Sequence, residues 1–128
     1  MNKNTSLASL LLRVGLGGMM LKHGWPKFQK LLKGDFSFAD PLGVGEAPTL
    51  LFGVLGEFIC PIFLIIGLKS KWAAIPPAIT MAVVAFIVHA DDPWKKQEFP
   101  LLYLIGFLAI FFLGSGRYSL DSKLRPGR

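Results

Sequence analysis

The sequence predicts an all-α integral membrane protein in which four helices form one bundle. The chain has 128 residues, of which 52% are hydrophobic, and its mean hydropathy is +0.52. Such a composition is too apolar for an ordinary soluble domain. Four segments approach the roughly 20 apolar residues that a helix needs to cross the hydrocarbon. Lipid forces them to be helical because it offers the backbone no hydrogen-bond partner. We therefore expect one transmembrane domain over residues 1–128.

The expected spans follow one another in the sequence with mostly short connections. They cover residues of about 6–25, 49–68, 72–89 and 99–113. The first span carries Arg13 near its centre and lacks a convincing small-residue cleavage site. We therefore interpret it as a retained helix and not as a secretory signal peptide.

The segment after the first span is amphipathic and has two interpretations. Phe28, Leu31 and Leu32 recur at helical spacing opposite three lysines. They predict either a short helix lying at the lipid headgroups or a continuation of the first helix past a kink at Pro26. Glycine and proline residues then indicate an exposed loop over residues 34–48.

The net charge of +6 comes mostly from residues that flank the spans, where topology signals and headgroup contacts are found. No basic stripe with interleaved aromatic residues occurs, so we expect the lipid bilayer and not nucleic acid as a partner. Four spans place seven cations on the side of the termini and six on the other side, which predicts both termini in the cytoplasm. The seven are Lys3, Lys69, Lys71, Arg117, Lys123, Arg125 and Arg128.

Arg13 and Glu57 are the single charges inside the first and second spans. An ionised side chain at bilayer depth costs about 2.5 to 17 kcal/mol depending on the measure, so it is rarely there without a partner or a task. Arg13 shares a helical face with Gly17, Met20 and Gly24, and Glu57 shares one with two glycines and a cysteine. Small residues mark the interior faces of membrane helices. Counting depth at about 1.5 Å per residue predicts that the two charges face each other.

A path of ionisable groups is expected from this pair to the non-cytoplasmic surface. His23, His89 and Glu98 all lie at that end of their spans. A quinone headgroup needs hydrogen-bond donors, a proton acceptor and an apolar slot. The candidate catalytic residues are Glu57, Arg13 and His89. The candidate substrate-binding residues are Arg13, His23, Glu57, Trp25 and Glu98.

Each candidate also has a structural interpretation. The Arg13–Glu57 pair can serve only to fix the register of the helices. Trp25 and the histidines suit an interface between water and lipid, and Glu98 suits the positive end of the fourth helix. These alternatives stay open at the level of sequence.

The sequence predicts no cofactor carried by the chain itself. Cys60 is the only cysteine, which excludes a self-contained thiol–disulfide oxidoreductase. No nucleotide or flavin motif occurs, so a bound quinone is the expected ligand. Haem b or a metal ion held by His23 and His89 is the less favoured alternative, because no spacing motif supports it and ligand type alone does.

Several motifs together resemble the DoxX family of small four-helix bacterial membrane proteins. They are the Arg-Val-Gly-Leu-Gly-Gly run at 13–18, His23-Gly24 followed by Lys27, Glu57 in a glycine-containing helix, and Gly-Ser-Gly-Arg-Tyr-Ser-Leu-Asp at 114–121. The resemblance covers nearly the full chain. It implies a multi-pass protein of the cytoplasmic (inner) membrane with both termini inside. The family is described as oxidoreductase-like, and relatives include a subunit of a thiosulfate:quinone oxidoreductase.

Two functions are therefore expected. The first is quinone- or thiol-linked redox metabolism, as a subunit or accessory of an oxidoreductase system that receives electrons from a partner protein. The second is a non-enzymatic membrane scaffold or chaperone subunit, whose buried Arg–Glu pair is structural. The many glycines permit close helix contacts within one bundle or between copies in a homo-oligomer.

Overall fold

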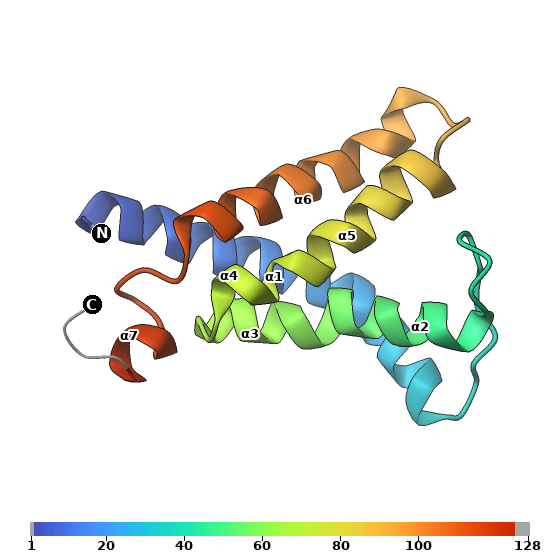
Figure 1. Ribbon diagram of the computed structural model, residues 1–128, viewed down its shortest axis with the longest axis horizontal. Coiled ribbons are helices and arrows are strands. Elements are labelled where there is room, and N and C mark those ends of the chain that lie inside the picture. The colour runs from blue at the N-terminus through green and yellow to red at the C-terminus, as the bar shows by residue number, and fades with distance from the viewer. Residues whose placement is uncertain (1, 125–128) are drawn as a thin grey trace.

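The computed structural model describes residues 2–124, and within that range all regular secondary structure is helical (Figure 1). Three helical segments are long and apolar enough to cross a membrane: Glu46–Ile66, Ser70–Val88 and Trp94–Leu113. The longest helix, α1 (Lys3–Leu32), packs against the first and the third of them. Arg125 and Arg128, two of the cations used to predict orientation, lie outside the described residues.

Helix α1 is continuous through Pro26, so the amphipathic segment extends the first helix. The side chain of Asn2 begins the helix by accepting a 2.8 Å hydrogen bond from the Thr5 amide. Its buried residues recur every three or four positions: Ser6, Ser9, Arg13, Gly17, Met20 and Gly24. This confirms the interior face that the sequence predicts around Arg13.

The second rod consists of α2 (Glu46–Val54), a π-helical turn η1 (Leu55–Ile59) and α3 (Cys60–Ile66). In the π turn the Cys60 amide donates to the Leu55 carbonyl, five residues back. Pro61 has no amide hydrogen, so the Glu57 carbonyl receives no bond from the usual i+4 donor. Gly67 ends α3 in the left-handed region at φ 76°, and the Leu68 amide bonds back to the Phe63 carbonyl.

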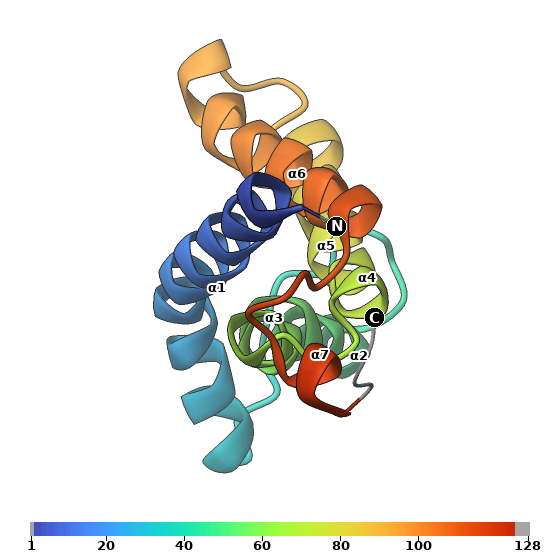
Figure 2. The same ribbon diagram turned by 90° about the vertical axis from the view of Figure 1, so that its left-hand side faces the viewer.

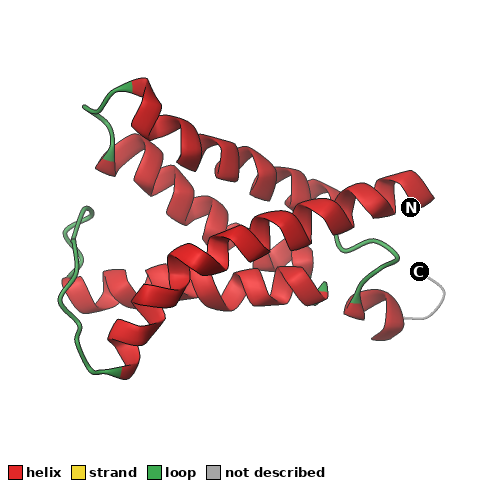
Figure 3. Ribbon diagram, turned by 180° about the vertical axis from the view of Figure 1, so that it is seen from behind, coloured by secondary structure: helices red, strands yellow, loops and turns green. Residues whose placement is uncertain are grey.

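The third rod contains α4 (Ser70–Ala73), α5 (Ile75–Val83) and a second π-helical turn, η2 (Val84–Val88). Helix α6 (Trp94–Leu113) follows, and α7 (Leu120–Leu124) ends the described chain. The sequence placed the start of the fourth span at Phe99, because the charged residues before it resemble a loop, but α6 begins five residues earlier. Seen from either side, the α5–α6 hairpin and the α1–α2 pair diverge toward one end of the molecule (Figures 1 and 3).

Gly24 lets α1 touch the second rod at Glu57. A Cβ atom on Gly24 would overlap the Glu57 carbonyl, which is backbone and cannot move aside, whereas a Cβ on Gly18 would meet nothing. We expect Gly24→Ala to lower the free energy of unfolding by about 1–3 kcal/mol. Gly18→Ala is the matched control, and it should be neutral or raise stability by up to about 1 kcal/mol through helix propensity. Reversible unfolding in detergent micelles measures both, and equal effects would contradict the close approach.

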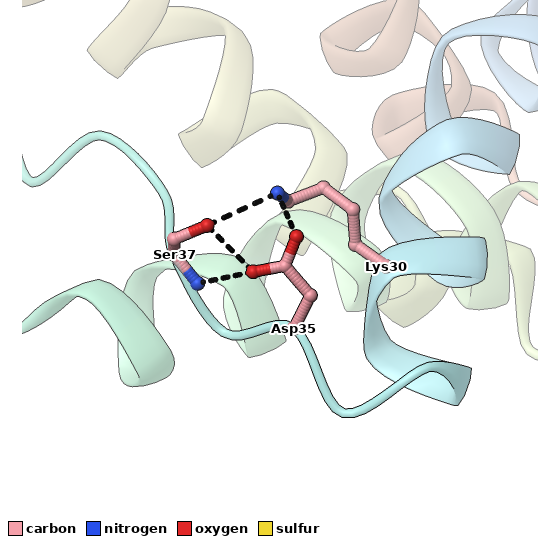
Figure 4. A network of polar contacts seen from close by, with 3 residues as sticks. All are labelled: Lys30, Asp35 and Ser37. Atoms are coloured by element: carbon pink, nitrogen blue, oxygen red, sulfur yellow. Dashed lines mark hydrogen bonds and ion pairs between the residues drawn. The ribbon is translucent and has the colours of Figure 1, made fainter.

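The loop after α1 is ordered by a network around Asp35 (Figure 4). Its carboxylate accepts bonds from the Ser37 hydroxyl and amide at 2.6 and 3.1 Å, and from the Lys30 ammonium at 3.0 Å. These bonds, led by that from the Ser37 side chain, lower the pKa of Asp35 to about 2.

The network should therefore persist through acidic solution. Because the folded-state pKa lies below the ordinary value, its contribution to loop order is full above the ordinary carboxyl range. That contribution is lost as the pH falls toward about 2. The Ser37 amide chemical shift, followed against pH, should titrate near that value. Asp35→Asn should abolish the titration, and a midpoint near 4 would contradict the network.

Candidate functional site

Arg13 and Glu57 do not form the pair that the sequence predicts. Arg13 is fully buried, and its guanidinium donates to the carbonyls of Leu64 at 3.1 Å and Tyr118 at 2.8 Å. Its Nε donates to the Ser9 hydroxyl at 3.2 Å. All three partners are neutral, and two are backbone groups. Arg13 therefore fastens elements together in the structure and does not face Glu57.

The elements that Arg13 fastens include the segment between α6 and α7. The Ser9 hydroxyl donates to the Gly114 carbonyl at 2.6 Å, and the Arg117 amide donates to the Ser6 hydroxyl at 3.2 Å. The segment thereby crosses the end of the bundle between α1 and α3 (Figure 2). We call residues 114–121 the C-terminal clasp.

Asp121 anchors the far end of the clasp to the turn between α3 and α4. Its carboxylate accepts bonds from the Lys69 amide at 2.7 Å and the Ser115 hydroxyl at 2.6 Å. Its own amide donates to the Gly67 carbonyl at 3.1 Å. The clasp comprises the Gly-Ser-Gly-Arg-Tyr-Ser-Leu-Asp motif, so this motif of the DoxX resemblance has a structural task.

Depth counting failed because it aligned the ends of the first and second spans. Ser6 and Ser9 instead lie beside the clasp, so α1 extends past the Gly67 turn that ends α3. This shifts α1 along the second rod. Arg13 then lies level with Leu64, while Gly24 lies level with Glu57.

Glu57 pairs with Lys27, one turn beyond Gly24 on the same helix. The side chain of Glu57 is 6% exposed and that of Lys27 is 23% exposed, so the pair is largely removed from solvent. The π turn η1 contains Glu57, and π turns inside helices occur frequently at functional sites. The Lys27 ammonium also lies 5.7 Å from the centre of the Phe38 ring in the following loop.

An open cavity of about 920 Å³ lies beside this ion pair, lined by residues of α1, η1, α5, η2 and α6 and by His89. Its inner wall includes the buried residues Met20, Glu57 and Met81. Its mouth carries Lys95 and Lys96, both exposed on the first turn of α6. The volume is typical of a site for a small organic ligand. Helices far apart in the sequence therefore contribute to one candidate site.

His89 also lines the cavity, and its ring is oriented by neighbouring polar groups. The Nδ1 atom lies 2.7 Å from the Asp92 carboxylate, and the Gln97 amide donates to the His89 carbonyl at 2.7 Å. The hydrogen bond with His89 lowers the pKa of Asp92, which is therefore a carboxylate acceptor at neutral pH. An acceptor at Nδ1 leaves Nε2 as the basic nitrogen of a neutral imidazole.

His23 lines the cavity together with Tyr103, which the sequence does not predict as a site residue. The His23 ring meets the Tyr103 ring edge to face, with 6.1 Å between centroids, and both line the cavity. The structure thus brings His23, Glu57 and His89 together, as the sequence predicts. The roles assigned to them stay predictions.

Besides Arg13, two more candidate residues do not line the cavity. Trp25 lies 5.9 Å from Phe58 and 6.1 Å from Phe28, measured between ring centroids, in an aromatic cluster of its own. Glu98 is exposed on α6. Both are predicted from their position near a span end. Their positions around the helix, however, keep their side chains out of the cavity lining.

Lys27 and Tyr103 are the site residues that the sequence analysis missed. Lys27 follows His23 by four positions, so the two share one helical face, and this signal could have identified it. Tyr103 had no comparable signal. Among residues 2–124, no three His, Cys, Asp or Glu side chains converge as a metal site requires.

Comparison with known proteins identifies the relatives of this chain. The DoxX family model matches residues 8–90. The chain belongs to the DoxX family. A Haemophilus influenzae protein named "Uncharacterized protein" is 31% identical over 119 residues, which cover 88% of this chain and 87% of that protein. A Bacillus subtilis protein named "Putative oxidoreductase CatD" is 26% identical over 129 residues, which cover 100% and 95%. No solved structure matches the chain.

Family membership and the apolar helices make this DoxX protein a multi-pass membrane protein. The matched stretch contains Arg13, Lys27, Glu57 and both histidines. Tyr103 and the C-terminal clasp lie beyond it. The ion pair of the cavity therefore belongs to the stretch that the family model recognises.

Proposed function

We propose that this DoxX protein is a redox component of the cytoplasmic (inner) membrane that binds a quinone or a thiol-type substrate in its cavity. The observation that carries the proposal is the Lys27–Glu57 pair at the inner wall, with His23 and His89 on the same cavity. Burying an ionisable group at membrane depth costs free energy, so a function is the default interpretation of such a group. An ion pair that only stabilised the packing of the helices would not require an open cavity beside it.

The side chains of the cavity suit a quinone headgroup. The Lys27 ammonium is a hydrogen-bond donor for one carbonyl, and the Glu57 carboxylate is a proton acceptor. Met20 and Met81 offer polarisable apolar surface to the ring. His89, oriented by Asp92, is placed to exchange protons between the cavity and the exposed connection after η2.

Reduction of a quinone to a quinol takes up two electrons and two protons. In this proposal Glu57 and His89 relay the two protons, each taking up a proton and passing it to a quinone oxygen. The two electrons come from a partner protein, or from two thiol groups that are oxidised to one disulfide and release two protons. The name of the Bacillus subtilis relative, "Putative oxidoreductase CatD", supports a redox role.

Both termini are proposed to lie in the cytoplasm, with α1 crossing the membrane as a fourth span. The start of α1 and the clasp lie at the same end of the molecule, because the Ser6 hydroxyl bonds to the Arg117 amide (Figure 1). An even number of crossings supports that arrangement, as does the excess of cations on the terminal side.

We expect Glu57→Gln to weaken the binding of a short-chain ubiquinone by about 10- to 100-fold, because Glu57 holds the Lys27 ammonium in place, and the hydrogen bond from that ammonium to a quinone carbonyl contributes about 1.5–3 kcal/mol. Titration of the purified full-length protein in detergent measures the affinity. The matched control is Glu98→Gln, which removes a carboxylate that does not line the cavity. It should bind the quinone as the wild type does.

Other outcomes of the same experiment decide against the proposal. If Glu57→Gln lowers only the thermal stability, with quinone binding unchanged, the scaffold or chaperone function replaces it. A Soret band in the visible spectrum of the purified protein would instead identify haem. His89→Asn provides a second test of the cavity should Glu57→Gln fail to fold.

A further inference from the structure

We propose that the mouth of the cavity binds the phosphate headgroup of an acidic phospholipid. The inference goes beyond the proposed function, because it concerns Lys95 and Lys96 and requires no redox reaction at the inner wall. Three features of α6 support it: the placement of charges, the uncapped start of the helix and the apolar track that follows.

Near the start of α6, positively charged side chains line the cavity and negatively charged ones do not. Lys95 and Lys96 line the cavity, whereas the carboxylates of the same connection, Asp91, Asp92 and Glu98, do not. Asp92 is held by His89. The mouth therefore presents two ammonium groups, of which Lys96 also interacts electrostatically with Asp92, and no carboxylate of this connection lines the cavity, which favours an anion.

The N-terminus of α6 adds to this positive potential. Its N-cap is Pro93, which makes no side-chain hydrogen bond to the helix, and its first turn has no acidic residue. A helix of 20 residues that starts in this way has no side-chain acceptor bonded to its first amides, which carry its positive dipole end. Phosphate groups bind readily at such ends.

An apolar track continues from the lysines along α6. Phe99, Leu102 and Ile105 recur at every third position and are 71, 56 and 64% exposed. Phe99 also lines the cavity beside the lysines. A ligand with an anionic head and an apolar chain fits both parts, whereas a free oxyanion uses only the first.

Native mass spectrometry of the full-length protein, titrated with phosphatidylglycerol or phosphatidylcholine, tests the inference. We expect the wild type to retain phosphatidylglycerol in preference to phosphatidylcholine. The double variant K95Q/K96Q should bind phosphatidylglycerol about 25-fold more weakly, a factor of about five for each lysine. The matched control K3Q/K123Q removes two exposed cations at the other end and should behave as the wild type.

Three results would overturn the inference. They are an unchanged affinity in K95Q/K96Q, an equal affinity of the wild type for both lipids, and displacement of phosphatidylglycerol by millimolar inorganic phosphate, which would show a site for free oxyanions. If K95Q/K96Q does not fold, K95R/K96R should keep the lipid preference, and its loss would contradict the inference equally. Glu57→Gln should leave lipid binding intact, so failure of the quinone proposal is distinguishable from failure here.

Discussion

Replacing Arg13 by methionine should lower the free energy of unfolding by about 3–5 kcal/mol. The guanidinium is fully buried and donates to the Leu64 and Tyr118 carbonyls and to the Ser9 hydroxyl. Methionine fills much of the volume but removes all three bonds; the Leu64 carbonyl keeps the Gly67 amide and the Ser9 hydroxyl keeps the Gly114 carbonyl. Each buried hydrogen bond to a charged group contributes about 1.5–3 kcal/mol. The clasp should also become accessible to proteases, since it loses one of its attachments to α1.

Reversible unfolding in mixed micelles measures the stability, and limited proteolysis measures the release of the clasp. Lys22→Met is the matched control, because it removes an exposed cation from the same helix and should change stability by no more than about 0.5 kcal/mol. Arg13→Lys should fall between the two, since an ammonium cannot reproduce the planar fork of donors. A clasp that stays protected in Arg13→Met would contradict the structural role of Arg13.

A double-mutant cycle should assign the partner of Glu57. We expect Lys27→Met and Glu57→Gln to be coupled by about 1.5–3 kcal/mol, because either change alone leaves a poorly solvated charge or amide without its partner. Arg13→Met and Glu57→Gln should be additive within about 0.5 kcal/mol. Leu64 lies seven residues beyond Glu57, which separates the two sites by about 10 Å along the rod.

Unfolding free energies of the three single variants and the two double variants complete both cycles. Strong coupling between Arg13 and Glu57, with none between Lys27 and Glu57, would restore the pairing that depth counting predicts. Coupling in both cycles would show that the two polar clusters communicate through the second rod. Additivity in both would mean that the Lys27–Glu57 contact contributes no net stability.

Properties of single helices could be predicted from the sequence. Hydropathy runs located the helical segments, and the periodicity of small residues identified the buried faces that contain Arg13 and Glu57. Hydropathy runs and periodicity depend only on the order of neighbouring residues in the chain, so the sequence shows them directly. The DoxX resemblance is confirmed by the family match over residues 8–90.

Relations between helices could not be predicted in the same way. Which residues of α1 lie level with Glu57 depends on where the turn at Gly67 falls against α1, and the clasp determines that position. The π turns rotate the residues that follow them, and neither hydropathy nor helical periodicity signals them. Of the predicted site residues, His23, Glu57 and His89 line the cavity, whereas Arg13, Trp25 and Glu98 do not. Lys27 and Tyr103 line it too, although the sequence analysis does not name them as site residues.

The clasp also sets an order of assembly during synthesis. Tyr118 follows Arg13 by 105 residues and Leu64 follows it by 51. At about 5–20 residues per second, the Tyr118 carbonyl is made roughly 5–20 s after Arg13. Throughout that interval Arg13 lacks the Tyr118 carbonyl as an acceptor, although the Ser9 hydroxyl is already present and the Leu64 carbonyl is made about halfway through. The first helix to be made can therefore settle into its final place only after the last residues of the clasp have been made.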